Sequence, residues 1–236
     1  MCTVTFVSKE NGDFILTSNR DELPQRKTIP PELVFENNTN LLYPKDAVAG
    51  GTWIGVSDKK RAINLLNGGF EPHERKASYR LSRGVVVKDL LIAEDVIEAI
   101  ENYDFYGVEP FTIILVEWSQ GLKLYTLVWD EKQKHFDSLS PGFYIWSSSP
   151  LYSESMKALR KRWFIDFIES NSADEKELLY FHQTAGTGDK ETNLIMDRGF
   201  IRTVSITQIV KRQETTSMLY KDLQTEMETL NLLALN

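Results

Sequence analysis

The chain has 236 residues, of which 42% are hydrophobic and 26% are charged, so it can bury a substantial core and has the composition of a globular protein. Its formal net charge of −7 argues against a general nucleic-acid binder, because contacts to phosphate need a basic surface. No run of about 18 apolar residues predicts a membrane segment, and the first residues lack the basic start of a signal peptide.

The N-terminal residues predict a β-hairpin. Residues 2–8 and 14–19 are both rich in β-branched and aromatic side chains, as strands usually are. Asn11 and Gly12 between them are a strong signal for a two-residue type I′ turn, because that turn needs positive φ at both central positions.

This hairpin would place charged side chains near the only cysteine, Cys2. A two-residue turn at Asn11 and Gly12 sets Cys2 opposite Asp21, with Arg20 one step away. Directly paired side chains have Cβ atoms roughly 4.5–5.5 Å apart, so Cys2 and Asp21 would be neighbours. A longer loop or a slip of one residue would change which charged group faces the sulfur.

The rest of the chain predicts more hairpins, interrupted by helices. Residues 24–44 contain prolines and are expected to form a surface excursion. Further strands are predicted at 52–57, 61–66, 111–118, 122–130, 142–150, 200–210 and 214–222, and helices at 84–103, 153–170 and 174–183. Antiparallel hairpins outnumber βαβ units, so we expect one α+β domain, residues 1–236, built on antiparallel sheets.

Cysteine and histidine usage narrows the chemistry. A single cysteine cannot form an internal disulfide, which favours a cytoplasmic protein. His73, His135 and His182 are far apart in the sequence and have no recognisable partner, so we expect them to be surface or capping residues and not catalytic ones. We therefore expect neither a structural zinc site nor a cofactor.

Cys2 has two interpretations. A free thiol has a pKa of about 8.5, and a neighbouring guanidinium such as that of Arg20 would favour the reactive thiolate. If Met1 is removed, the new α-amine, with a pKa of about 8, can act as the base that activates the sulfur, and Asp21 can hold that amine in position. Alternatively, Cys2 is an inert packing residue, since cysteine is often buried.

Several motifs, in chain order, carry a family resemblance: Met1-Cys2, Asn19-Arg20-Asp21-Glu22, Gly50-Gly51-Thr52-Trp53-Ile54-Gly55, Asn67, a Ser-rich turn after Tyr144, and Ile201-Arg202-Thr203. Together they resemble the NRDE family, also called the transport and Golgi organization 2 family, within the N-terminal nucleophile (Ntn) hydrolase superfamily. The resemblance implies a four-layer αββα sandwich with two antiparallel sheets between helical layers.

The resemblance also implies roles, because the superfamily includes cysteine enzymes similar to bile salt hydrolases and penicillin V acylases. Cys2 would be the nucleophile and, through its amine, the base. Arg20 would support the thiolate, and Asp21 would orient the amine. Asn67 would donate its side-chain amide to an oxyanion, and Arg202 would complete the charged site.

The same residues have structural readings. Asn67-Gly68 is an ordinary turn signal, and Arg202 at the start of a strand is usually a solvated charge. For Gly50 to Trp53 we favour a structural interpretation, a tight turn with a packed indole. Ser148 stands where the acylases carry an asparagine, and it presents one O–H instead of an NH₂ pair.

Two functions follow from the sequence. The first is a cysteine amidohydrolase that cleaves a non-peptide carbon–nitrogen bond in a small-molecule N-acyl amide, through a thioester on Cys2. The second is a non-catalytic binding or trafficking protein for haem or lipid that retains the fold, which the serine at Ser148 favours. A haem carrier would need an axial ligand from Cys2 or a histidine.

Overall fold

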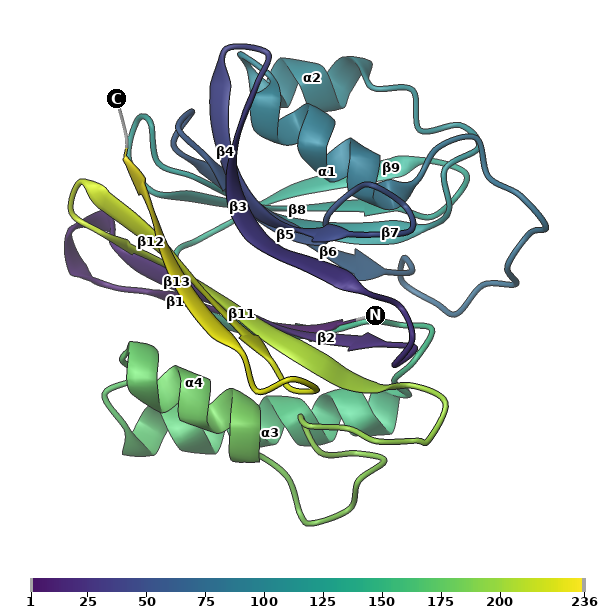
Figure 1. Cartoon of the computed structure of the whole chain (residues 1–236), viewed down its shortest axis with the longest axis vertical. Helices are drawn as coiled ribbons and strands as arrows, with labels where there is room; N and C mark the ends of the chain where they lie inside the picture. The colour runs from purple at the N-terminus through teal and green to yellow at the C-terminus, as the bar shows by residue number, and fades with distance from the viewer. Residues whose placement is uncertain (1, 235–236) are drawn as a thin grey trace.

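The computed structural model describes residues 2–234 of the chain, and the side chains of residues 3–234. Two antiparallel sheets pack face to face, and a pair of helices covers the outer face of each (Figure 1). The helices are α1 (Arg83–Ile92), α2 (Val96–Asn102), α3 (Glu154–Ser170) and α4 (Glu175–Thr184). This αββα arrangement confirms the predicted α+β fold class. No helix within the described residues is long and apolar enough to span a membrane.

One sheet contains strands from the N-terminal and the C-terminal parts of the chain. Its six strands follow the order β10-β1-β2-β11-β12-β13. They are β1 (Cys2–Ser8), β2 (Phe14–Glu22), β10 (Phe143–Ser147), β11 (Arg202–Arg212), β12 (Thr215–Asp222) and β13 (Glu228–Ala234). Strand β1 therefore lies inside the sheet, with β2 on one side and β10 on the other.

The other sheet is a meander of seven strands, in which each strand pairs with the next one in the chain. Its strands are β3 (Thr28–Glu36), β4 (Thr39–Asp46), β5 (Ile54–Ser57), β6 (Arg61–Asn67), β7 (Phe111–Glu117), β8 (Lys123–Trp129) and β9 (Lys134–Leu139). Helices α1 and α2 come from the connection between β6 and β7, and α1 packs on β5 and β6.

Several predicted elements differ from the structure. The expected excursion at 24–44 is wrong, because it contains β3 and most of β4. The two prolines of β3, Pro30 and Pro31, are tolerated because β3 is an edge strand with an irregular register between Ile29 and Glu32. Strands β9 and β13 were not predicted. The single helix at 84–103 is two helices, because Asp95 caps the second by accepting from the N–H groups of Ile97 and Glu98.

The N-terminal hairpin has a longer loop than the predicted two-residue turn. Glu10–Gly12 form one 3₁₀ turn, η1, and the Lys9 N–H donates to the Asp13 carbonyl at 2.8 Å. Asn11 has φ of 58° and Gly12 of 73°, so their left-handed preference is used, but in a three-residue loop. The register consequently shifts by one, and Cys2 pairs with Arg20 instead of Asp21.

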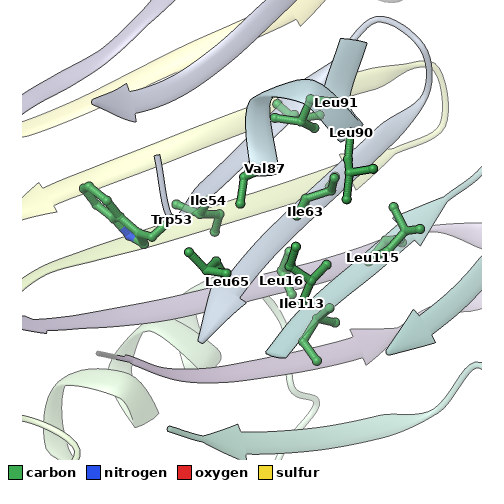
Figure 2. Packing of buried hydrophobic residues seen from close by; sticks show 14 of the residues in the cluster. Leu16, Trp53, Ile54, Ile63, Leu65, Val87, Leu90, Leu91, Ile113 and Leu115 are labelled. Carbon is green, nitrogen blue, oxygen red and sulfur yellow. The ribbon is translucent and has the colours of Figure 1, made fainter. Parts of the chain in front are cut away.

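The core explains which way the β2 side chains face. Phe14 and Leu16 belong to the main cluster, which contains residues of both sheets and of α1, whereas Ile15 belongs to a second cluster with α3 and α4. Figure 2 shows Leu16 and the α1 residues Val87 and Leu90 within the main cluster. Side chains of a strand alternate between its faces, so both faces of β2 are buried, one against the second sheet and one against helices.

Candidate active site

Because side chains along β2 alternate between the two faces of the sheet, the neighbours Arg20 and Asp21 face different layers. Arg20 follows Phe14 and Leu16 on the face toward the second sheet, where it lines a cavity. Asp21 lies on the opposite face, where it contacts Tyr152 beside helix α3. The two charged residues therefore approach position 2 from different sides of the sheet.

Arg20 is a buried cation fixed by several partners. Its Nη2 donates to Asp46 Oδ2 at 2.6 Å, and its Nη1 donates to Thr28 Oγ1 at 2.9 Å. Its guanidinium lies 4.2 Å from the centroid of the Trp53 ring, a cation–π contact. Burial opposes ionisation of Asp46, but hydrogen bonds from the Ala49 N–H and Arg26 hold the pKa of this carboxyl below its ordinary value. Asp46 thus offsets part of the charge that Arg20 brings to the site.

Asp21 is completely buried and is held by two hydroxyl groups. Tyr152 Oη donates to Asp21 Oδ2 at 2.5 Å, and Thr203 Oγ1 donates to Asp21 Oδ1 at 2.7 Å. Burial raises the pKa of Asp21, while the hydrogen bond from Tyr152, the positive charge of Arg160 and the hydrogen bond from Thr203 oppose that rise. These neighbours therefore favour the ionised form of the carboxyl group, which burial disfavours.

Arg160 is a second buried arginine, which sequence reasoning missed. Its guanidinium stacks 3.7 Å from the centroid of the Tyr152 ring, and its Nη1 donates to Thr3 Oγ1 at 2.5 Å. Its Nη2 donates to the Asn193 carbonyl at 2.7 Å. An available signal was its spacing of four residues from the buried Phe164 on α3, because an arginine in an apolar stripe implies a buried polar contact.

His182 lies in the last turn of α4, but its side chain has 0% exposure, so the expectation of a surface or capping histidine is wrong for this residue. Its Nδ1 lies 2.7 Å from Asn19 Oδ1, and its Nε2 lies 2.8 Å from Thr5 Oγ1. Since an amide oxygen only accepts, Nδ1 carries the proton, and the Thr5 hydroxyl donates to Nε2. Burial, reinforced by Arg160, lowers the pKa of His182 to about 3. Asn19 therefore anchors the helical layer.

A cavity of about 350 Å³, which we call the charged cavity, contains two of the predicted site residues, Arg20 and Asn67. Its other charged or polar walls include Glu22, Arg26, Asp46, Trp53, His73, Arg75, Arg83 and Glu109. Asn67 ends β6, and within the described residues no group forms a hydrogen bond with its side chain. Its amide is therefore available to a ligand in this cavity.

Ser148 lines a different cavity of about 540 Å³, which we call the serine cavity, together with Leu66, Trp146 and Lys161. Its side chain is 1% exposed, and its Oγ has no hydrogen-bond partner in the part of the chain that the structure describes. The β1–β10 register pairs Thr3 with Ser147, so Ser148 follows directly beside position 2.

A close turn-to-turn contact is made by residues that line the two cavities: Pro150 lines the charged cavity, and Gly69 and Ser149 line the serine cavity. Ser149 Oγ donates to the Gly69 carbonyl at 2.5 Å. Gly68 has φ of 83°, and a Cβ at this position would lie 2.4 Å from Pro150 Cδ. Only glycine fits here without strain. The predicted turn at Asn67-Gly68 therefore exists, and it also holds Asn67 at the wall of the charged cavity.

Arg202 does not line either cavity. It begins β11 opposite Glu22, and its Nη2 donates to Gln224 Oε1 at 3.0 Å. Its neighbour Thr203 instead contacts Asp21. Sequence reasoning missed Thr203 because a threonine at a strand start gives no distinctive signal.

The glycine-rich motif before β5 has a packing role, as we favoured. A Cβ on Gly51 would lie 2.5 Å from the backbone of Gly84 at the start of α1. Thr52 Oγ1 donates to the Pro44 carbonyl at 2.7 Å, and the Trp53 ring is buried. The motif brings α1 against the sheet and gives Arg20 its aromatic partner.

Cys2 is placed only by its backbone, which pairs with Arg20 in the β1–β2 ladder. Its side chain, and Met1, lie outside the described residues. The nucleophile and its amine consequently stay predictions, as do the roles of the other site residues.

Comparison with known proteins gives a family and a fold. The model of the family described as Transport and Golgi organisation 2 matches residues 1–228. No curated protein matches the chain in sequence.

Solved structures similar to this chain include a bile acid hydrolase, a penicillin acylase and an acid amidase orthologue. A mutant conjugated bile acid hydrolase from Clostridium perfringens has a TM-score of 0.61 at 11% identity, covering 100% of this chain and 93% of that one. A penicillin V acylase from Agrobacterium tumefaciens has a TM-score of 0.60 at 11% identity, covering 99% and 86%. The Caenorhabditis elegans orthologue of N-acylethanolamine-hydrolyzing acid amidase has a TM-score of 0.61 at 15% identity, covering 89% and 92%. The chain shares the fold of these proteins.

Proposed function

The chain belongs to the Transport and Golgi organisation 2 family, and from this premise we propose that it is a cysteine amidohydrolase of the N-terminal nucleophile type. Its substrate would be a small-molecule N-acyl amide in the cytoplasm, and the reaction would use no metal or cofactor. The names of its structural neighbours, which include an acylase and an acid amidase, support hydrolysis of a non-peptide carbon–nitrogen bond.

The observation that carries this proposal is the pairing of Cys2 with Arg20, with Asn67 in the same cavity as Arg20. Residues directly opposite each other in an antiparallel pair share a face. The backbone register therefore pairs the proposed nucleophile with the residue that carries the fixed guanidinium. Asp21, on the other side of the sheet, is suited to the α-amine.

The proposed reaction begins with proton transfer from the Cys2 thiol to its own α-amine after removal of Met1. The thiolate, supported by the Arg20 charge, attacks the amide carbonyl carbon and forms a carbon–sulfur bond. The resulting oxyanion accepts hydrogen bonds from the Asn67 amide and a backbone N–H. One such donor is typically worth about 3 kcal/mol in the transition state.

The tetrahedral intermediate then collapses to products. The carbon–nitrogen bond breaks, the α-ammonium returns its proton to the departing amine, and an acyl thioester remains on Cys2. A water molecule, deprotonated by the free α-amine, attacks the thioester and releases the carboxylic acid and the thiol. Asp21 holds the amine in both steps, which requires its carboxylate form.

The intact mass of the purified protein is the first test, because Met1 still attached to Cys2 removes the base and ends this mechanism. With Met1 absent, the second test is turnover of a panel of N-acyl amides. The Cys2→Ala variant should abolish turnover of any substrate found. Turnover that survives in Cys2→Ala would contradict the proposal.

A second candidate function is a non-catalytic binding protein, which Ser148 favours. Its short side chain leaves a buried Oγ without a partner among the described residues and next to a cavity of about 540 Å³. Titration with haem, followed by absorbance, separates the two functions. A Soret shift that disappears in Cys2→Ala would support a carrier ligated by this cysteine, and no shift would exclude one.

A further inference from the structure

The charged cavity carries more positive than negative side chains. Its walls hold four arginines, Arg20, Arg26, Arg75 and Arg83, against three carboxylates, Glu22, Asp46 and Glu109. The whole chain has a formal net charge of −7, so this cationic excess runs against the charge of the protein as a whole. An excess of one charge in a concave site raises the local concentration of ligands of the opposite sign.

The carboxylates of the cavity are shared, so they do not neutralise each arginine separately. Asp46 Oδ2 accepts from Arg20 Nη2 at 2.6 Å and from Arg26 Nε at 2.7 Å. Glu109 lies 3.0 Å from Arg83 Nη2 and 4.0 Å from Arg75 Nε. Each of these two carboxylates therefore contacts more than one arginine.

Arg26 and Arg83 retain donors for a ligand. A guanidinium has five N–H groups. In the described part of the chain, both Nη groups of Arg26 lack a hydrogen-bond partner, because only its Nε bonds to Asp46. Arg83 donates Nη1 to the Pro110 carbonyl at 3.2 Å and pairs Nη2 with Glu109, and its Nε has no partner within the same residues.

The same cavity receives the N-terminus of α1. Ser82 at the N-cap forms no side-chain capping bond, and the first turn of α1 contains no acidic residue. The helix dipole therefore adds uncompensated positive potential. Trp53, also in the wall, has a buried Nε1 with no hydrogen-bond partner among residues 3–234.

We propose that the charged cavity binds an anionic group of the ligand, a carboxylate or a phosphate, through Arg26 and Arg83. Guanidinium groups match both anions, because their planar donors can bind two oxygens at once. The substrate class rests on the proposed function: the substrate is then an N-acyl amide that carries an anionic group. The anion contact itself depends only on the arginines.

Binding calorimetry on the full-length Cys2→Ala variant tests this proposal without consuming the probe. One matched pair is N-octanoylglycine and the neutral N-octanoylglycinamide, and the other is N-octanoyl-O-phosphoethanolamine and the neutral N-octanoylethanolamine. At least one anionic member should bind about 10-fold more tightly than its neutral partner at low ionic strength. The pair that shows this preference identifies the anion as carboxylate or phosphate.

The same measurement in Arg26→Gln with Arg83→Gln should bring the ratio close to one, through weaker binding of the anionic member alone. Arg212→Gln is the control, because Arg212 is an exposed arginine that pairs with Glu175 and does not line the cavity. Should the double variant not fold, Arg26→Gln alone, which changes a partly exposed side chain, should still reduce the ratio several-fold.

Equal affinities within both pairs would overturn the proposal, and so would a preference that survives loss of both arginines. These outcomes are separate from failure of the proposed function. Anion preference without turnover by the wild-type protein would reject the Cys2 chemistry and leave the anion site standing. Turnover without anion preference would support the Cys2 chemistry and reject the anion site.

Discussion

Replacement of His182 by glutamine should change how the stability of the protein depends on pH. The His182 ring is buried, with both nitrogens bonded, and its pKa falls to about 3 from the ordinary 6.5. Between pH 6.5 and about 3, His182 therefore binds a proton in the unfolded chain but not in the folded protein. The stability that the neutral ring contributes is complete above pH 6.5 and is lost as the pH falls toward 3.

The magnitude follows from the size of this pKa difference. Each pH unit below 6.5 removes about 1.4 kcal/mol from the free energy of unfolding, until the folded protein also takes up the proton. At pH 4.5 the wild-type protein should have lost roughly 2–3 kcal/mol through this group. His182→Gln keeps a donor and an acceptor for Asn19 and Thr5 but does not titrate.

Urea unfolding at several pH values between 8 and 4.5 measures the effect. At pH 8, His182→Gln should be less stable than wild type, because its side chain fits the site less well. The difference should shrink as the pH falls, since other titrating groups act equally in both proteins. Parallel stability curves over this range would refute the assigned protonation state.

Three further substitutions test the site. Tyr152→Phe removes a hydrogen bond that lowers the pKa of Asp21, so the acidic limb of the pH profile of kcat/KM should move to higher pH. An acidic limb at the same pH would show that ionisation of Asp21 does not control the reaction. Arg20→Met should slow the alkylation of Cys2, the single cysteine, by iodoacetamide about 10-fold at pH 7. Mass spectrometry measures this rate, and an unchanged rate would place the guanidinium too far from the sulfur. Gly68→Ala should lower the free energy of unfolding by more than about 1 kcal/mol, because φ is 83° and Pro150 occupies the space; a melt identical to wild type would show that the turn relaxes.

The sequence patterns identified most of the fold because hairpin signals are local. The hairpins at 52–66 and 111–130 each combine short apolar segments with a short polar turn between them, and both hairpins are present. Strand β3 escaped prediction because its prolines suggest a loop, and only its position at the sheet edge makes them tolerable.

The register error has a specific cause. The pair Asn11-Gly12 carries the dihedral preference of a two-residue turn, but the same preference also suits a three-residue loop. A shift of one residue replaced Asp21 by Arg20 as the partner of Cys2. Composition of the turn alone does not distinguish these loops.

The buried polar layer beneath Asp21 was beyond local sequence signals. Tyr152, Arg160 and Thr203 come from three different segments and meet only after the helices pack on the sheet. The predicted hairpin supplied Arg20 and Asp21 as candidates, and the family resemblance added Asn67 because it reports position along the chain. It could not assign the contacts that hold them.

The proposed reaction requires Cys2, freed of Met1, to attack an acyl carbon. The most direct measurement is mass spectrometry of the N-terminal peptide after the protein has been mixed with an N-acyl amide and quenched rapidly in acid. The account predicts a peptide that begins at residue 2 and carries the acyl group as a thioester on its sulfur. A peptide that still begins with Met1, or an unmodified thiol while the amide is being cleaved, would contradict it.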